Sequence, residues 1–212
     1  GRLDVVLRAG GSGKVRLLHQ LQSGRVVERV GEPDDPFHGI EAGPDSTVAL
    51  VDWDADGDLD LVIGLPDGKI RYFEQVKVTG MTERDGPTNP LRDISFGTVA
   101  NPALVDWNLD GSMDIIVGDD GEGALRLFEA GGAEGTVERK GIRGNPYENV
   151  AVAVGSRPAP AFGDWDADGD LDLVLGLGDG TLRFVERLGN YMMERAGPGE
   201  NPFHAVDVGS NA

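Results

Sequence analysis

Short apolar runs recur along the chain, and acidic, glycine-rich segments separate them. The clearest are Leu-Val-Ile, Ile-Ile-Val and Leu-Val-Leu at residues 61–63, 115–117 and 173–175, and Val-Val-Leu at residues 5–7 fits the same slot. Continuous apolar runs of this length between turn residues are typical of strands that are buried on both faces. No stretch combines a helical period with capping residues. We therefore predict an all-β protein.

The sequence repeats itself. An Asp-Trp pair starts at Asp52, Asp106 and Asp164, at intervals of 54 and 58 residues, shortly before each of the last three apolar runs. Three further landmarks occur four times each. These are an arginine between apolar residues (Arg16, Arg71, Arg126, Arg183), a Glu-Arg pair (from Glu28, Glu83, Glu138, Glu194), and a proline before a bulky residue (Pro36, Pro90, Pro146, Pro202). Coincident landmarks at one period indicate a repeat architecture.

Each repeat has room for four short strands. In the second repeat we expect strands at residues 46–51, 59–65 and 69–75, and a fourth between residues 79 and 94, where prolines interrupt it. Four strands in a unit of this size are typical of a β-propeller blade. The prediction is a β-propeller of four-stranded antiparallel blades in a single domain, residues 1–212. Its repeats are residues 1–50 (incomplete), 51–104, 105–162 and 163–212.

The two ends of the chain do not complete a blade. Aligning Asp4 with Asp60 places Gly1 on Gly57, so joining the ends leaves a gap equivalent to residues 47–56. Two alternatives remain open, namely a four-blade ring with one incomplete blade and an arc or half of a larger propeller. An arc would leave strand edges for another chain to cover, and two head-to-tail copies would form a homo-oligomer that closes the propeller. Asp4 would lack its loop partners, so we expect no calcium there.

The charge and amino-acid composition of the chain exclude several kinds of partner and of chemistry. Among 212 residues, 37 Asp and Glu face 19 Lys and Arg, for a formal net charge of −18, and 33 glycines suit many tight turns. That charge argues against nucleic acid and anionic membranes as partners. No apolar run is long enough for a membrane span, so no membrane insertion is expected. The absence of cysteine excludes disulfides and thiolate chemistry, and three scattered histidines make no zinc signature.

Much of the acidity is concentrated in three loops that begin at the Asp-Trp pairs. Oxygen ligands occupy loop positions 1, 3, 5 and 9, glycine occupies position 6, and a backbone carbonyl at position 7 completes the set, a pattern that suits Ca²⁺ better than Mg²⁺. The predicted ligands of the three calcium sites are Asp52, Asp54, Asp56, Asp58 (backbone) and Asp60; Asp106, Asn108, Asp110, Ser112 (backbone) and Asp114; and Asp164, Asp166, Asp168, Asp170 (backbone) and Asp172.

These loops are not EF-hands. An EF-hand needs a glutamate at position 12 and a following helix, whereas Ile63, Val117 and Leu175 occupy that position inside apolar runs. We expect the position-9 aspartate to close each site and the ion to fix the turn between two strands. The sharper alternative, an ion that also bridges to a ligand, remains open.

With these motifs in hand, the chain resembles the FG-GAP/VCBS repeat family. The segments 52–60 and 162–172 are similar to the calcium loops of integrin α-subunit propellers and of some propeller lectins. The resemblance implies calcium at the loop positions above, an extracellular or cell-surface location, and a role in recognition or adhesion. It names no ligand. The chain departs from the family's usual propeller of about seven blades.

No nucleophile and base stand in a catalytic arrangement, so we expect no enzyme activity. His38 and His204 follow equivalent Pro-Phe pairs, which favours packing. The recurrent arginines and Glu-Arg pairs favour ion pairs between blades over a set of anion sites. The tryptophans and Tyr72, Tyr147 and Tyr191 are candidates for stacking on sugars, although core positions are commoner for such tryptophans.

Two functions follow from these observations. The first is a non-enzymatic calcium-binding propeller module for extracellular recognition or adhesion, with a glycan or a protein as its ligand. The second is a purely structural repeat fragment, excised or engineered from a larger propeller protein, with no ligand of its own.

Overall fold

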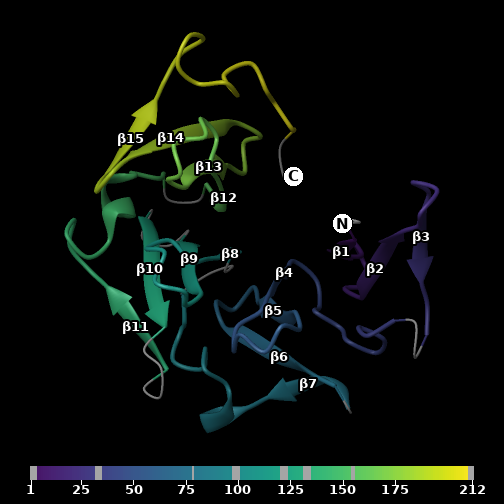
Figure 1. The fold of residues 1–212 in the computed structure, drawn as a ribbon. Helices are drawn as coiled ribbons and strands as arrows, with labels where there is room; N and C mark the ends of the chain where they lie inside the picture. The colour runs from purple at the N-terminus through teal and green to yellow at the C-terminus, as the bar shows by residue number, and fades with distance from the viewer. Residues whose placement is uncertain are drawn as a thin grey trace. The chain divides into compact units, whose positions relative to one another are not determined.

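Four antiparallel β-sheets make up the part of the chain that the structure describes (Figure 1). The structure is a computed structural model and describes residues 4–31, 35–77, 79–96, 101–119, 124–130, 135–153 and 156–209. Two sheets belong to a first compact unit, Gly1–Ser95, and two to a second, Phe96–Ala212. The prediction of an all-β chain is confirmed.

The first unit contains two sheets whose strands follow one another in chain order. Blade 1 consists of β1 (Val5–Arg8), β2 (Val15–Gln20) and β3 (Val26–Arg29). Blade 2 consists of β4 (Thr47–Val51), β5 (Asp60–Gly64), β6 (Ile70–Val76) and β7 (Gly80–Arg84), and the short 3₁₀ turn η1 (Gly86–Thr88) follows it.

The second unit repeats this plan. Blade 3 consists of β8 (Asn101–Val105), β9 (Asp114–Asp119), β10 (Ala124–Ala130) and β11 (Thr136–Arg139), followed by the 3₁₀ turn η3 (Pro146–Asn149). Blade 4 consists of β12 (Ala159–Gly163), β13 (Asp172–Gly176), β14 (Leu182–Leu188) and β15 (Tyr191–Arg195). Among the described residues no helix is long and apolar enough to cross a membrane.

The sheets are β-propeller blades, as predicted. The strands expected at residues 46–51, 59–65 and 69–75 are β4, β5 and β6, and the fourth is β7. Blade 1 has three strands among the described residues, where the other blades have four. Each four-stranded blade begins one strand before the predicted repeat boundary, because β4 pairs with β5 across the Asp-Trp loop and ends at residue 51.

Each unit has its own apolar core, which the second strands and the Pro-bulky landmarks supply. Every residue of β5 is buried, which confirms that the apolar runs are strands covered on both faces. In unit 1, Leu61 and Ile63 pack in one cluster with Phe37. In unit 2, Tyr147 packs with Leu173 and Leu175 and is fully buried. The proline therefore introduces a core residue that follows the last strand of a blade.

The recurrent arginines form ion pairs within blades, so the expectation of pairs between blades was wrong. Arg71 of β6 donates from Nε to Oε1 of Glu83 on the neighbouring β7, at 2.6 Å. The pairs Arg16–Glu28, Arg126–Glu138 and Arg183–Glu194 are equivalent. Adjacent antiparallel strands bring the two side chains together as diagonal neighbours on one face of the sheet, because Glu83 lies opposite Phe73, two residues beyond Arg71.

The same arginines also hold the segment that leads into their blade. Arg71 donates to the carbonyl oxygen of Glu41 at 2.8 Å, and Arg183 donates to that of Ala151 at 2.6 Å.

The expected packing role of His38 and His204 is wrong, since both side chains are exposed.

Candidate metal centres

Three acidic loops connect the first and second strands of blades 2, 3 and 4, and their backbones have one conformation. The glycine at position 6 has φ of 93°, 90° and 94° at Gly57, Gly111 and Gly169. This left-handed region is open to glycine and strained for other residues. Position 4 is left-handed as well, with φ between 59° and 62°, although alanine or leucine occupies it. The same strained turn therefore occurs in all three loops.

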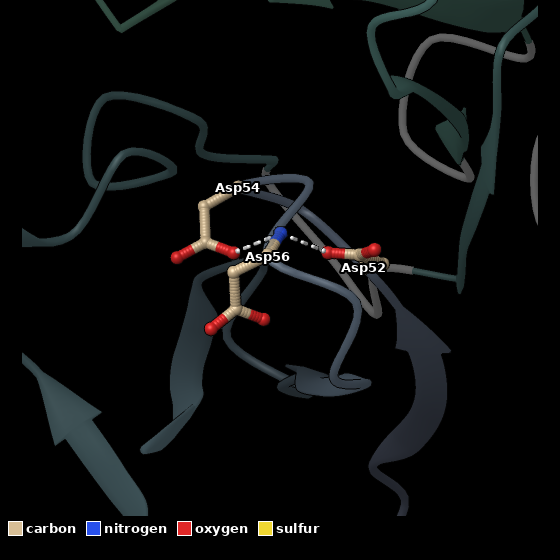
Figure 2. A group of neighbouring side chains, drawn as sticks. All are labelled: Asp52, Asp54 and Asp56. Carbon is tan, nitrogen blue, oxygen red and sulfur yellow. Dashed lines mark hydrogen bonds between the residues drawn. The ribbon is translucent and has the colours of Figure 1, made fainter. Parts of the chain in front are cut away.

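The carboxylates of each loop turn inward and accept hydrogen bonds from its backbone. The N–H of Asp56 donates to Asp52 at 3.1 Å and to Asp54 at 3.2 Å, as Figure 2 shows. The N–H of Gly57 donates to the second oxygen of Asp52, and that of Asp58 to Asp56 at 2.9 Å. The same bonds recur in the loops of residues 106–114 and 164–172. These bonds orient the side chains toward a common centre.

Two of the loops gather three carboxylates in one place. One oxygen each from Asp52, Asp54 and Asp56 lie within 4.8 Å of one another, and the same holds for Asp164, Asp166 and Asp168. Burial and then the charge of Asp60 raise the pKa of Asp54. Burial likewise raises the pKa of Asp166, and the charges of Asp168 and Asp172 add to the shift. A divalent cation with oxygen ligands would relieve this repulsion, so the residues present fit Ca²⁺.

The loop of residues 106–114 differs at position 3, where Asn108 replaces an aspartate. The Asn108 amide accepts from the N–H of Asp110 and donates to that residue's carboxylate at 2.9 Å. Hydrogen bonds from the Ser112 N–H and the Asn108 amide lower the pKa of Asp110. This loop keeps the conformation of the other two but carries one carboxylate fewer and less repulsion.

The position-9 aspartates Asp60, Asp114 and Asp172 are buried and tie the loop to the third strand. Asp60 accepts from the N–H of Trp53 at 3.1 Å and, with its other oxygen, from that of Gln75 on β6 at 2.8 Å. Asp114 and Asp172 make the equivalent bonds. The sequence analysis missed this anchoring role. Metal ligation by these three aspartates, and by the carbonyls of Asp58, Ser112 and Asp170, stays a prediction.

Asp4 occupies the position-9 place in blade 1 and keeps its anchoring bond. It accepts from the N–H of Gln20 at 3.0 Å and lies 3.0 Å from Nδ1 of His19. This contact gives Asp4 a role that needs no metal ion.

A tryptophan at loop position 2 lines a pocket in blades 3 and 4. The blade 3 pocket, of about 430 Å³, lies between Trp107, the turn from Ile142 to Pro146, and the residues Asn190 and Tyr191 of blade 4. The blade 4 pocket, of about 280 Å³, lies between Trp165 and the equivalent turn at residues 198–202. Of the candidate tyrosines, Tyr72 and Tyr147 are buried and Tyr191 is 70% exposed.

Propeller blades with repeated acidic loops define a class, the β-propeller repeat proteins. Within it, the model of the FG-GAP-like repeat matches residues 52–117 and again residues 106–175, together more than half of the chain. The chain therefore belongs to the FG-GAP-like repeat family, as its sequence indicated. Each match starts at an Asp-Trp pair and ends in the second strand of the following blade. No curated protein matches the sequence.

Proposed function

We propose that the chain is a non-enzymatic, calcium-binding propeller module for extracellular recognition. One observation carries the metal assignment: three loops share a strained backbone conformation, and in two of them three carboxylates converge within 4.8 Å. Burial first, and then the charges of neighbouring carboxylates, raise the pKa values of two members of the set, Asp54 and Asp166. When bound, the ion would supply charge compensation and hold the turn between two strands.

Thermal unfolding of the metal-free protein, with and without millimolar Ca²⁺, tests this assignment. An ion that binds only the folded state stabilises it by about 2.7 kcal/mol per site at a hundredfold excess over Kd. For a chain of this size we expect a rise in Tm of several degrees or more. Mg²⁺ at the same concentration is the control and should shift Tm much less. Absence of a shift with Ca²⁺, or an equal shift with Mg²⁺, would contradict calcium binding.

The blade 3 pocket is the candidate recognition site, with a glycan as the ligand that its chemistry favours. Tyr191, which is 70% exposed, offers an aromatic face beside Trp107, and Arg143 and Asn190 offer hydrogen-bond donors. Sugars present both apolar C–H faces and hydroxyl groups, so they suit a pocket with aromatic walls and polar side chains. An extracellular or cell-surface location is part of this proposal, because millimolar Ca²⁺ there would keep the loops loaded.

A glycan array in Ca²⁺ separates recognition from the alternative of a purely structural repeat. Saturable binding that Tyr191→Ala abolishes, while Val26→Ala on exposed β3 leaves it intact, supports the glycan site. A blank array contradicts it and favours the structural fragment. Light scattering on the same sample measures whether copies assemble and close the propeller.

A further inference from the structure

The two tryptophan pockets of unit 2 are built alike but differ in what lies over the tryptophan ring. In blade 3, Arg187 of the following blade lies over the Trp107 ring, 5.3 Å from its centroid. The guanidinium also donates from Nη1 to the carbonyl oxygen of Trp107 at 2.7 Å. In blade 4, Trp165 occupies the equivalent position and is 55% exposed. Aromatic side chains surround it on the protein side, with the Phe203 ring 4.7 Å from its own.

The charges that line the two pockets are opposite in sign. The blade 3 pocket is lined by Arg143, with a neutral Asn108 at loop position 3. In blade 4, Gly199 replaces that arginine, and the lining includes Asp166, Glu186 and Glu200 and no basic residue. An aromatic face beside carboxylates attracts a cation, and the ring quadrupole and the negative charges act together.

We propose that the blade 4 pocket binds an arginine side chain of a partner peptide. The guanidinium would stack on Trp165 and donate to its carbonyl oxygen, as Arg187 does at Trp107. Arginine fits better than lysine, because its planar group stacks on an aromatic ring and still presents donors at its edge. With calcium bound, Asp166 would serve the ion, and Glu186 pairs with Arg195 at 2.6 Å. Glu200, which is exposed at the pocket rim, would then be the main carboxylate for the incoming cation.

The site is independent of the proposed glycan pocket, so the two proposals can fail separately.

Titration of Ca²⁺-loaded protein with the peptide acetyl-Ala-Arg-Ala-amide tests the arginine site, with the indole N–H signals of the three tryptophans as the readout. We expect one indole signal, assigned to Trp165 by its loss in Trp165→Phe, to shift saturably. The lysine peptide should bind several-fold more weakly, and the peptide with neutral citrulline should not bind.

Variants locate the contact. By calorimetry, Trp165→Ala should weaken binding by about tenfold or more, and Glu200→Gln by about threefold. Val137→Ala, an exposed apolar residue of blade 3, is the matched control and should bind as the parent chain does. Equal binding of arginine and citrulline peptides, or an unshifted Trp165 signal, would overturn the proposal. A self-assembled species that Trp165→Ala dissociates would overturn it too, since a second copy would then fill the pocket.

Discussion

Asn108 is the residue that distinguishes one candidate metal loop from the other two. It stands where Asp54 and Asp166 stand, and it replaces a repelling carboxylate by an amide that bonds Asp110. Because calcium affinity rises with the number of charged ligands, the loop of residues 106–114 should be the weakest of the three sites.

Exchanging this residue between loops tests the point. Asn108→Asp should strengthen calcium binding at its loop by about tenfold, because it adds a charged ligand in an unchanged backbone. Asp54→Asn should weaken the loop of residues 52–60 by a similar factor. Calorimetric titration of both variants measures the change. Unaltered affinities in both would show that position 3 does not ligate the ion.

For single residues, the sequence indicated which aspartates share a loop but not every hydrogen bond that they make. The spacing of aspartates predicted three calcium loops, and in two of them, around Gly57 and Gly169, the structure brings three carboxylates together. The bond from Asp60 to the N–H of Gln75 depends on strand pairing across 15 residues, which no local spacing reveals. The exposure of the tyrosines could not be predicted from the sequence either, because only the packing of the blades makes Tyr147 buried and Tyr191 exposed.

At the scale of the element, the close approach of β9 to the segment before β12 depends on one glycine. A Cβ at Gly118 would lie 2.3 Å from the carbonyl oxygen of Pro158, and that backbone has little freedom to move, because the same oxygen accepts from Asn101 at 3.1 Å. Blades 3 and 4 therefore meet through backbone contact.

Gly118→Ala should lower the free energy of unfolding by about 2 kcal/mol or more, because a methyl group must displace backbone. Gly163→Ala in β12 is the matched control, since a Cβ there meets nothing within 4 Å. Urea unfolding of both variants measures the difference. Equal losses would show that the contact with Pro158 is not tight.

The ion pairs within blades predict how stability depends on acid. The hydrogen bond from Arg71 lowers the pKa of Glu83, and that from Arg16 lowers the pKa of Glu28. A carboxylate with a lowered pKa in the folded state contributes stability above its unfolded value, near 4.3, and loses it as pH falls through the folded value. The partial exposure of the Arg71–Glu83 pair keeps its contribution below about 1 kcal/mol.

Glu83→Gln should therefore destabilise the protein by less than about 1 kcal/mol at pH 7, and the difference should shrink as pH falls below about 4.3 and vanish below the lowered pKa of Glu83 in the folded state. Urea unfolding across this pH range, with exposed Glu148→Gln as the control, measures it. A difference that persists in acid would show that Glu83 acts through packing and not through charge. The landmarks of the sequence indicated that these groups recur, but only the register of β6 against β7 shows which pairs form.

For the whole molecule, the formal charge of −18 makes self-repulsion a general cost of folding. Three bound calcium ions would carry six positive charges and bring the net charge to about −12. The order of the strands and the number of blades were predictable from the repeats.

The Tm of the metal-free protein should accordingly rise by several degrees between 20 mM and 500 mM KCl, because salt screens like charges. In saturating Ca²⁺ the same increase in KCl should shift Tm less. Thermal melting at both salt concentrations measures the two shifts. A salt response of the same size with and without Ca²⁺ would mean that the ions do not relieve the repulsion.

Each sequence repeat starts one strand later than the corresponding blade, and this offset determines how such a chain can gain a blade. A segment cut at the Asp-Trp pairs, such as residues 52–105, carries the last three strands of one blade and the first strand of the next. A tandem duplication with these ends adds a whole blade and leaves every sheet with its full set of strands. Each such segment ends with the first strand of a blade, and the segment that follows it supplies the other three strands of that blade. Lengthening the gene by one such segment would therefore leave no sheet with a missing strand.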